Sequence, residues 1–214
     1  DDVWHEDKVS KTLEKMKEIE LDVSRPAMVH SDLQVVDSEL RVIDPSFMHF
    51  SKLNGYRLEL KQLLVQNVVT GCTMMINQAL AAMSCIKIPS QGILMHDWWL
   101  ALLAAACGQT GFLDEATMDY RQHGGNVIGA KNVRSFSYIF TRAKEGRKSI
   151  WDTFWQAKAF SRCFAKILDK EAVALIDTYG ALADSNGFHR RAAYLRWGFL
   201  KIGMCRVIGQ FLLG

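Results

Sequence analysis

The chain has 214 residues, of which 49% are hydrophobic and 23% charged, and its formal net charge at pH 7 is +3. This composition is typical of a globular protein with one domain, or one domain and an appendage, and the charge is too small to indicate nucleic-acid binding. The five cysteines form no Cys-x-x-Cys pair, which argues against a zinc cluster or a disulfide framework and favours a reducing, cytoplasmic setting. No uninterrupted apolar run reaches the roughly 18–20 residues of a membrane span.

The first 45 residues predict one helix and two strands. Val9, Leu13, Met16 and Ile19 recur at helical spacing and form the apolar side of an amphipathic helix. After Arg25-Pro26, the alternating segment 27–37 predicts a strand, and a second strand over 40–44 ends at Pro45. The chain opens on Asp1 without a methionine, so we expect it to be a fragment of a longer protein.

The middle of the chain continues the alternation. The aromatic segment 46–56 predicts a covering loop, 58–69 a helix, 72–76 a short strand, and a further helix begins near Asn77. A helix over 93–108 is followed by a strand, a turn and a second strand that lead into a glycine-containing loop near residue 129. Strands that alternate with helices over this length indicate an α/β domain, which we place at 1–132.

The remaining residues, 133–214, show no strand pattern and many basic side chains. They predict a mainly helical C-terminal region with four helices, over 133–145, 149–168, 170–185 and 189–212.

The run from Ile93 to Gly108 has all its ionisable side chains at its start, where His96 and Asp97 precede Trp, Leu, Ala and Cys residues alone. Asp97 is then the N-cap or a first-turn residue of a largely buried helix, where free N–H groups and the helix dipole favour a carboxylate. An ionised, partly desolvated carboxylate is what a general base requires. The alternative is that Asp97 only caps the helix.

Two further groups of residues could bind a ligand. The acidic pair Asp1 and Asp2 could hold a divalent cation through oxygen ligands, although terminal carboxylates are commonly just solvated. Arg121, Gln122 and His123 end a predicted strand and supply a cation and a metal-ligating side chain; the alternative for His123 is a polar loop histidine.

Five short motifs occur in order within residues 1–132, namely DDVW (1–4), VHSDLQVVD (29–37), NVVTGCTMMIN (67–77), MHDWWLAL (95–102) and DEATMDYRQHGGNVIGAK (114–131). In order and spacing they resemble the bacterial family-two glycosyltransferases of the GT-A fold, in particular the rhamnosyltransferase-like members that build polysaccharide chains. The resemblance implies an α/β fold that comprises the C-terminal, acceptor-side part of a GT-A domain. The N-terminal half that holds the nucleotide would be missing.

The resemblance also implies roles on the donor side. Asp1 matches the second aspartate of the Asp-x-Asp that binds a divalent metal, Mg²⁺ or Mn²⁺, and the diphosphate of the nucleotide sugar, with Asp2 beside it. His123, and more loosely Arg121 and Gln122, match the region that closes over the diphosphate, where His123 reaches the metal. The metal and the cationic groups would stabilise the departing diphosphate.

On the acceptor side, Asp97 matches the family's catalytic base, which takes the proton from the acceptor hydroxyl as it attacks the anomeric carbon. The other residues that the resemblance assigns to this side are Thr70, Gly71, Cys72, His96 and Trp98. The expected function is inverting transfer of a sugar, with rhamnose as the candidate, from a nucleotide-sugar donor to a saccharide or lipid-linked acceptor in polysaccharide biosynthesis. We expect the 214-residue chain alone to be inactive.

The last 30 residues contain no acid after Asp184, and their cations are Arg190, Arg191, Arg196, Lys201 and Arg206. An apolar, aromatic and basic segment suits a helix on an anionic membrane surface, which would place the protein on the inner face of the membrane. The glycines within the segment weaken a single continuous helix, and a helix packed on the domain or on a partner chain is the alternative. A non-catalytic membrane- or partner-binding module is accordingly the second functional hypothesis.

Overall fold

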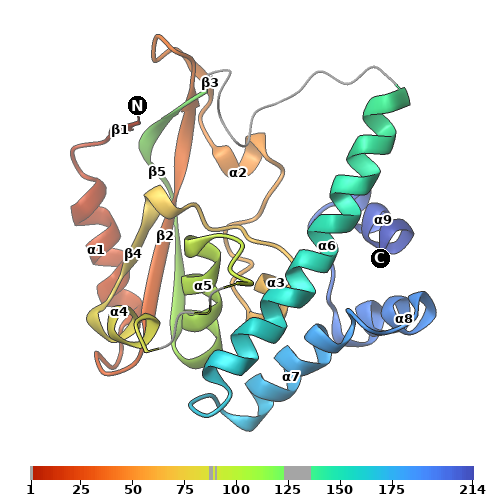
Figure 1. The fold of residues 1–214 in the computed structure, drawn as a ribbon. Helices are drawn as coiled ribbons and strands as arrows, with labels where there is room; N and C mark the ends of the chain where they lie inside the picture. The colour runs from red at the N-terminus through yellow and green to blue at the C-terminus, as the bar shows by residue number, and fades with distance from the viewer. Residues whose placement is uncertain (1, 87–88, 90, 123–135) are drawn as a thin grey trace.

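The computed structural model describes residues 2–86, 89, 91–122 and 136–214, with the side chains of 136–144 excepted. It is a mixed α/β structure, in which a twisted sheet with α1 on its outer face stands beside a group of helices formed by the C-terminal third of the chain (Figure 1). This arrangement agrees with the predicted order of an α/β part followed by a helical part.

The sheet has five strands in the order β1-β5-β2-β3, and β4 also pairs with β2. The central strands β2 and β5 are parallel, whereas every other pairing is antiparallel. Because β2 has neighbours on both edges and helices on both faces, nine of its ten residues are buried. The strands are β1 (Val3–Trp4), β2 (Ala27–Val36), β3 (Val42–Asp44), β4 (Met74–Ile76) and β5 (Gln109–Arg121).

The prediction of two strands and a turn after Gly108 is wrong, because β5 is one strand of 13 residues. Its register against β2 shifts where Ser31 pairs with Leu113 and Asp32 with Ala116. The two acidic residues between these positions on β5, Asp114 and Glu115, are exposed, so the ladder is irregular there but the strand continues.

Helix α1 (Lys8–Ile19) covers one face of the sheet, but only Met16 and Ile19 of the four residues we expected pack on the core. Lys8, Thr12 and Met16 are buried, whereas Val9 and Leu13 are exposed. The Lys8 ammonium donates to the Cys72 carbonyl at 2.9 Å, so its aliphatic stem lies along the core side of the helix. The helix is therefore confirmed, and the assignment of its buried face is corrected.

The other face carries the short helices α2 (Phe47–Phe50) and α3 (Leu60–Leu63), the 3₁₀ turn η1 (Gly71–Thr73), and then α4 (Gln78–Ser84) and α5 (His96–Cys107). The expected loop over 46–56 contains α2, because the Ser46 hydroxyl accepts from the His49 amide and caps that turn. The helix expected over 58–69 is much shorter. Beyond the end of α3, the Asn67 side chain bonds both the amide and the carbonyl of Val69 and stabilises a turn instead of a helix.

The C-terminal region consists of α6 (Phe136–Phe164), α7 (Lys170–Ala181), α8 (Gly187–Trp197) and α9 (Met204–Leu213). Helix α6 replaces two of the predicted helices, and the predicted helix over 189–212 is two helices. The break falls at Gly198 and Gly203, whose φ angles of 71° and 84° suit glycine and no helix interior. Within the part of the chain that the structure describes, no helix is both long and apolar enough to cross a membrane.

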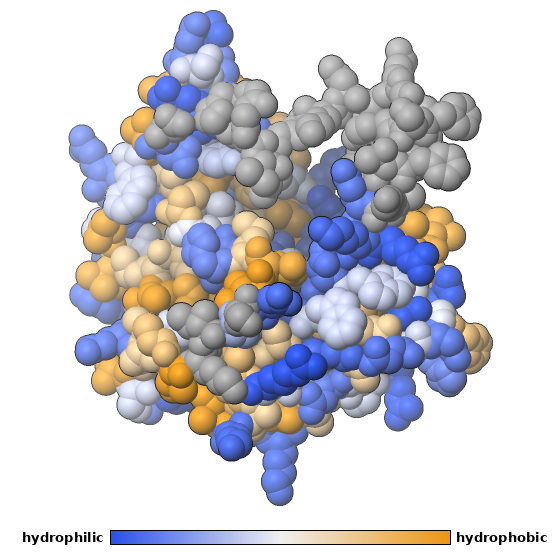
Figure 2. Space-filling model, in the orientation of Figure 1, coloured by the Kyte–Doolittle hydropathy of each residue, from blue (hydrophilic) through white to orange (hydrophobic). Residues whose placement is uncertain are grey.

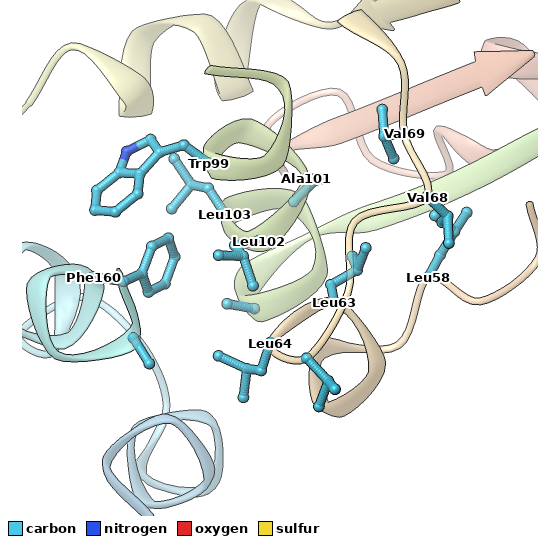
Figure 3. Close-up of a cluster of buried hydrophobic side chains, with 14 of the residues drawn as sticks. Leu58, Leu63, Leu64, Val68, Val69, Trp99, Ala101, Leu102, Leu103 and Phe160 are labelled. Carbon is cyan, nitrogen blue, oxygen red and sulfur yellow. The ribbon is translucent and has the colours of Figure 1, made fainter. Parts of the chain in front are cut away.

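The helical region shares one hydrophobic core with the sheet region (Figure 3). Trp99 of α5 packs edge-on against Phe160 of α6, with ring centroids 5.1 Å apart. Leu63 and Leu64 complete the same cluster from the α3 side. Because Asp97 lies in the first turn of α5, this packing fixes the C-terminal helices relative to the candidate base.

Candidate functional site

A cleft of about 670 Å³ lies beside the first turn of α5, within the range of ligand pockets. One wall comes from the segment 65–70 and the start of α5, and aromatic side chains of α2 add to the lining. The other contributions come from the C-terminal region, through Ser149, Lys201 and Arg206. Sheet region and helical region thus build the cleft together.

Asp97 lies in this cleft with only 2% of its surface exposed. Its Oδ1 accepts hydrogen bonds from the Asn67 side-chain amide at 3.2 Å and the Trp98 backbone amide at 2.6 Å, and its Oδ2 accepts one from the Gly71 amide at 3.0 Å. The N-cap position belongs to Met95, so Asp97 is the first-turn residue of the two alternatives. Two of its three donors come from outside the helix, which a plain capping residue does not need.

These bonds leave the carboxylate room for a ligand. A carboxylate has about four lone-pair positions, and the described residues occupy three of those on Asp97. The remaining position can accept a hydrogen bond from a hydroxyl bound in the cleft.

The predicted neighbours of Asp97 are brought to it. A Cβ on Gly71 would lie 2.7 Å from Nε2 of His96, so glycine at this position lets the imidazole lie close over the turn. Thr70 and Trp98 line the cleft, and the Trp98 indole is fixed because its Nε1 donates to the Leu63 carbonyl at 2.6 Å. A rigid aromatic face suits the apolar C–H side of a sugar ring.

Cys72, the remaining acceptor-side prediction, is half-buried and is not among the residues that line the cleft. The pKa of its thiol is raised, first by burial and then by the negative charge of Asp2, with a smaller contribution from Asp97. Cys72 therefore lies within electrostatic reach of both predicted acidic groups.

On the predicted donor side, the structure brings Asp2 and Arg121 together. Oδ1 of Asp2 accepts from the Arg121 backbone amide at 3.3 Å, and the Gln122 amide extends the sheet by donating to Val36 at 2.8 Å. None of these three residues lines the cleft of Asp97. Asp1 and His123, the predicted metal ligands, lie outside the described residues.

Of the acidic pair and the histidine predicted near the metal, the structure describes Asp2 alone, so only its side chain can be compared with what a divalent metal requires. Its carboxylate is exposed, and oxygen donors of this kind are the ligands that Mg²⁺ and Mn²⁺ prefer, so the group that is described fits in its chemistry. Among the described residues there is no cluster of three or more His, Cys, Asp or Glu side chains that could hold a metal.

Several residues of the cleft were missed by the sequence interpretation, above all Asn67, Lys201 and Arg206. Asn67 had a local signal, because asparagine often bonds the backbone two residues further on and ends a helix. Lys201 and Arg206 had none, since more than 100 residues separate them from Asp97.

Comparison with known proteins adds no family to this geometry. No protein-family model, no curated protein and no solved structure matches the chain.

Proposed function

We propose that the chain is the acceptor-side part of an inverting glycosyltransferase with a GT-A architecture, and that Asp97 is its general base. The observation that carries the proposal is the Asp97 carboxylate, which is held by three N–H donors and lies in a cleft with aromatic side chains in its lining. A pure cap would have no reason to lie in a cleft of ligand size.

In the proposed reaction an acceptor hydroxyl binds beside Asp97. As its oxygen attacks the anomeric carbon of the donor, the proton passes to the carboxylate, and the bond from that carbon to the diphosphate breaks with its electron pair on the diphosphate. Asn67 and Gly71 hold the carboxylate in place, and Trp98 orients the acceptor ring. A positioned base of this kind contributes about 10²–10⁴ in rate.

Asp1 and His123 would hold the Mg²⁺ or Mn²⁺ ion, with Asp2 beside them, and such an ion neutralises charge on a departing diphosphate. The proposed donor is a nucleotide sugar, with dTDP-rhamnose the candidate that the motif resemblance favours, and the acceptor is a saccharide, free or lipid-linked.

A calorimetric titration tests the donor side. We expect dTDP, in the presence of Mg²⁺ or Mn²⁺, to bind a chain extended at the N-terminus by a nucleotide-binding half more tightly than it binds the 214-residue chain. Binding by neither chain would contradict the proposal and favour the second candidate.

That candidate is a module that binds an anionic membrane surface at the inner face of the membrane. Met204, Ile208 and Leu212 follow one another at four-residue spacing along α9 and are 79%, 50% and 73% exposed. Hydrophobic surface is visible where α9 lies, at the right-hand edge of Figure 2. Arg191 and Arg196 of α8 are exposed as well, and anionic lipids would complement them.

Flotation with vesicles of phosphatidylglycerol and phosphatidylcholine tests this candidate. We expect the chain to float with the vesicles, to be released by salt, and to lose binding on Leu212→Ser. The control Leu21→Ser changes an exposed leucine on a different part of the molecule. An unchanged flotation of Leu212→Ser would contradict membrane binding through α9.

A further inference from the structure

The cleft of Asp97 also contains cations that the proposed reaction does not use. Lys52, Lys201 and Arg206 line it, and the one carboxylate among its lining residues is Asp97 itself. Within the described part of the chain, no carboxylate lies within ion-pair distance of these three side chains. The cleft thus carries more positive than negative charge.

Hydrogen bonds fix the segment 201–206, which carries Lys201 and Arg206, against residues 51, 52 and 66. Arg206 donates to the carbonyls of Ser51 and Lys52 at 2.6 and 2.8 Å. The Ile202 amide donates to Oε1 of Gln66 at 2.8 Å, and Gln66 directly precedes the asparagine that bonds Asp97. A short path of contacts therefore connects the segment between α8 and α9 with Asp97, the candidate base.

Of the three cations, Lys201 has the fewest protein groups to balance the charge of its side chain. Its backbone amide bonds Oε1 of Gln210 at 3.0 Å, which fixes the loop, but its ammonium has no protein acceptor among the described residues. The pKa of Lys201 is lowered, first by burial and then by the positive charge of Arg206. Partly buried cations side by side cost free energy that a bound anion would offset.

The chemistry favours a phosphate over a carboxylate. Two or three neighbouring cations match an oxyanion that carries more than one charge and has several acceptor oxygens. The diphosphate of the donor is not the natural occupant, because Asp2 and Arg121, which mark the donor side, do not line this cleft.

We propose that Lys201, together with Arg206 and Lys52, binds a phosphate or diphosphate group on the acceptor. The acceptor is then a saccharide joined to its carrier through a phosphate ester, with the sugar hydroxyl at Asp97 and the phosphate at Lys201. This assignment of the substrate class rests on the proposed glycosyltransferase function, whereas the anion site itself does not.

Calorimetric titration of the 214-residue chain with inorganic diphosphate, without metal, tests the site directly. We expect binding that weakens about tenfold or more in Lys201→Gln, since a hydrogen bond to a charged group is lost, and that weakens with salt. Lys17→Gln, at an exposed position of α1, is the matched control and should bind as the unchanged chain does. Circular dichroism confirms that each variant is folded.

Three results would overturn the assignment. They are no diphosphate binding, equal binding by Lys201→Gln, and binding of glucuronate, a carboxylate probe, as tight as that of diphosphate. The two proposals fail separately. If Asp97→Asn abolishes transfer while Lys201→Gln leaves diphosphate binding unchanged, the anion site alone is wrong. If diphosphate binding requires Lys201 but Asp97→Asn leaves transfer intact, the glycosyltransferase mechanism is wrong.

Discussion

Asp97 and Lys201 line the same cleft, and each is an ionisable side chain largely withdrawn from water, but their surroundings differ. Asp97 is surrounded by three N–H donors, two of them on the segment 67–71. Lys201 has Arg206 beside it and no carboxylate within reach in the described structure. The Asp97 wall supplies hydrogen-bond donors that fix its carboxylate. The Lys201 wall supplies no acceptor for the ammonium among the described residues, so a bound anion could balance its charge.

The largest expected effect comes from breaking the packing that keeps the two walls together. Phe160 of α6 packs on Trp99 of α5, and α6 in turn packs against α9. Phe160→Ala should lower the free energy of unfolding by about 3–5 kcal/mol in urea denaturation, because it leaves a cavity in the shared core. Phe188→Ala, an exposed control, should change it by less than about 0.5 kcal/mol. A similarly small loss for Phe160→Ala would show that the walls do not depend on this contact.

His30 is a third buried ionisable side chain to compare with Asp97 and Lys201. Among the described residues it has a single hydrogen bond, to the Gly55 carbonyl at 3.1 Å. Burial lowers its pKa from 6.5 to about 4. As the pH falls through this window the unfolded chain binds a proton that the folded chain does not, so stability decreases, by up to about 3 kcal/mol.

Urea denaturation at pH 7, 5.5 and 4.5 measures this effect of His30. We expect His30→Gln to lose less stability over this range than the unchanged chain, whereas His189→Gln, at an exposed position of α8, should behave like the unchanged chain. An equal loss in His30→Gln would rule out His30 as the cause.

On the Asp97 wall, Asn67→Ala removes one of the two donors to Oδ1 of Asp97 and two bonds to Val69. We expect the free energy of unfolding to fall by about 1–3 kcal/mol and transfer activity to fall with it, because the carboxylate loses a fixed partner. Asn54→Ala removes a similar local bond, to the Tyr56 amide, in an exposed loop and should cost less than about 1 kcal/mol. Equal effects of the two variants would remove the special role of Asn67.

On the Lys201 wall, removing the charged group should raise the free energy of unfolding instead of lowering it. Lys201→Met keeps the aliphatic stem and removes a partly buried charge next to Arg206, so we expect a gain of about 0.5–1 kcal/mol in chemical denaturation. Because the pKa of Lys201 is lowered in the folded state, its cost is present at neutral pH and disappears as the pH rises toward 10.5, where the gain should vanish. A loss of stability at pH 7 would show that the ammonium has a stabilising partner.

Local sequence patterns were sufficient for α5, the helix that carries Asp97, but not for the segment 65–70 beside it. The apolar run predicts α5, and its closing Gly108 is required, since a Cβ there would lie 1.9 Å from the Pro26 carbonyl oxygen. Asn77 as the start of α4 and Asp97 as a first-turn residue follow from the same capping chemistry.

What sequence alone could not supply depends on contacts between distant segments. The buried side of α1 includes Lys8 because a carbonyl at residue 72 accepts its ammonium, and no pattern within the helix reveals that bond. The sequence suggested that Lys201 belongs to a basic surface segment. The chain instead breaks at Gly198 and Gly203, and Lys201, between these glycines, lines the cleft. The irregularity of β5 against β2 is likewise a property of the pairing and not of either strand.

The most direct measurement of the central claim is sugar transfer by Asp97→Asn in a chain that carries the nucleotide-binding half, with the midpoint of thermal unfolding measured beside it. If Asp97 is the general base, transfer falls by about 10²–10⁴ while the variant stays folded at the assay temperature. If transfer by the folded variant is undiminished and only the unfolding midpoint falls, Asp97 is a structural residue of the helix start and not a general base.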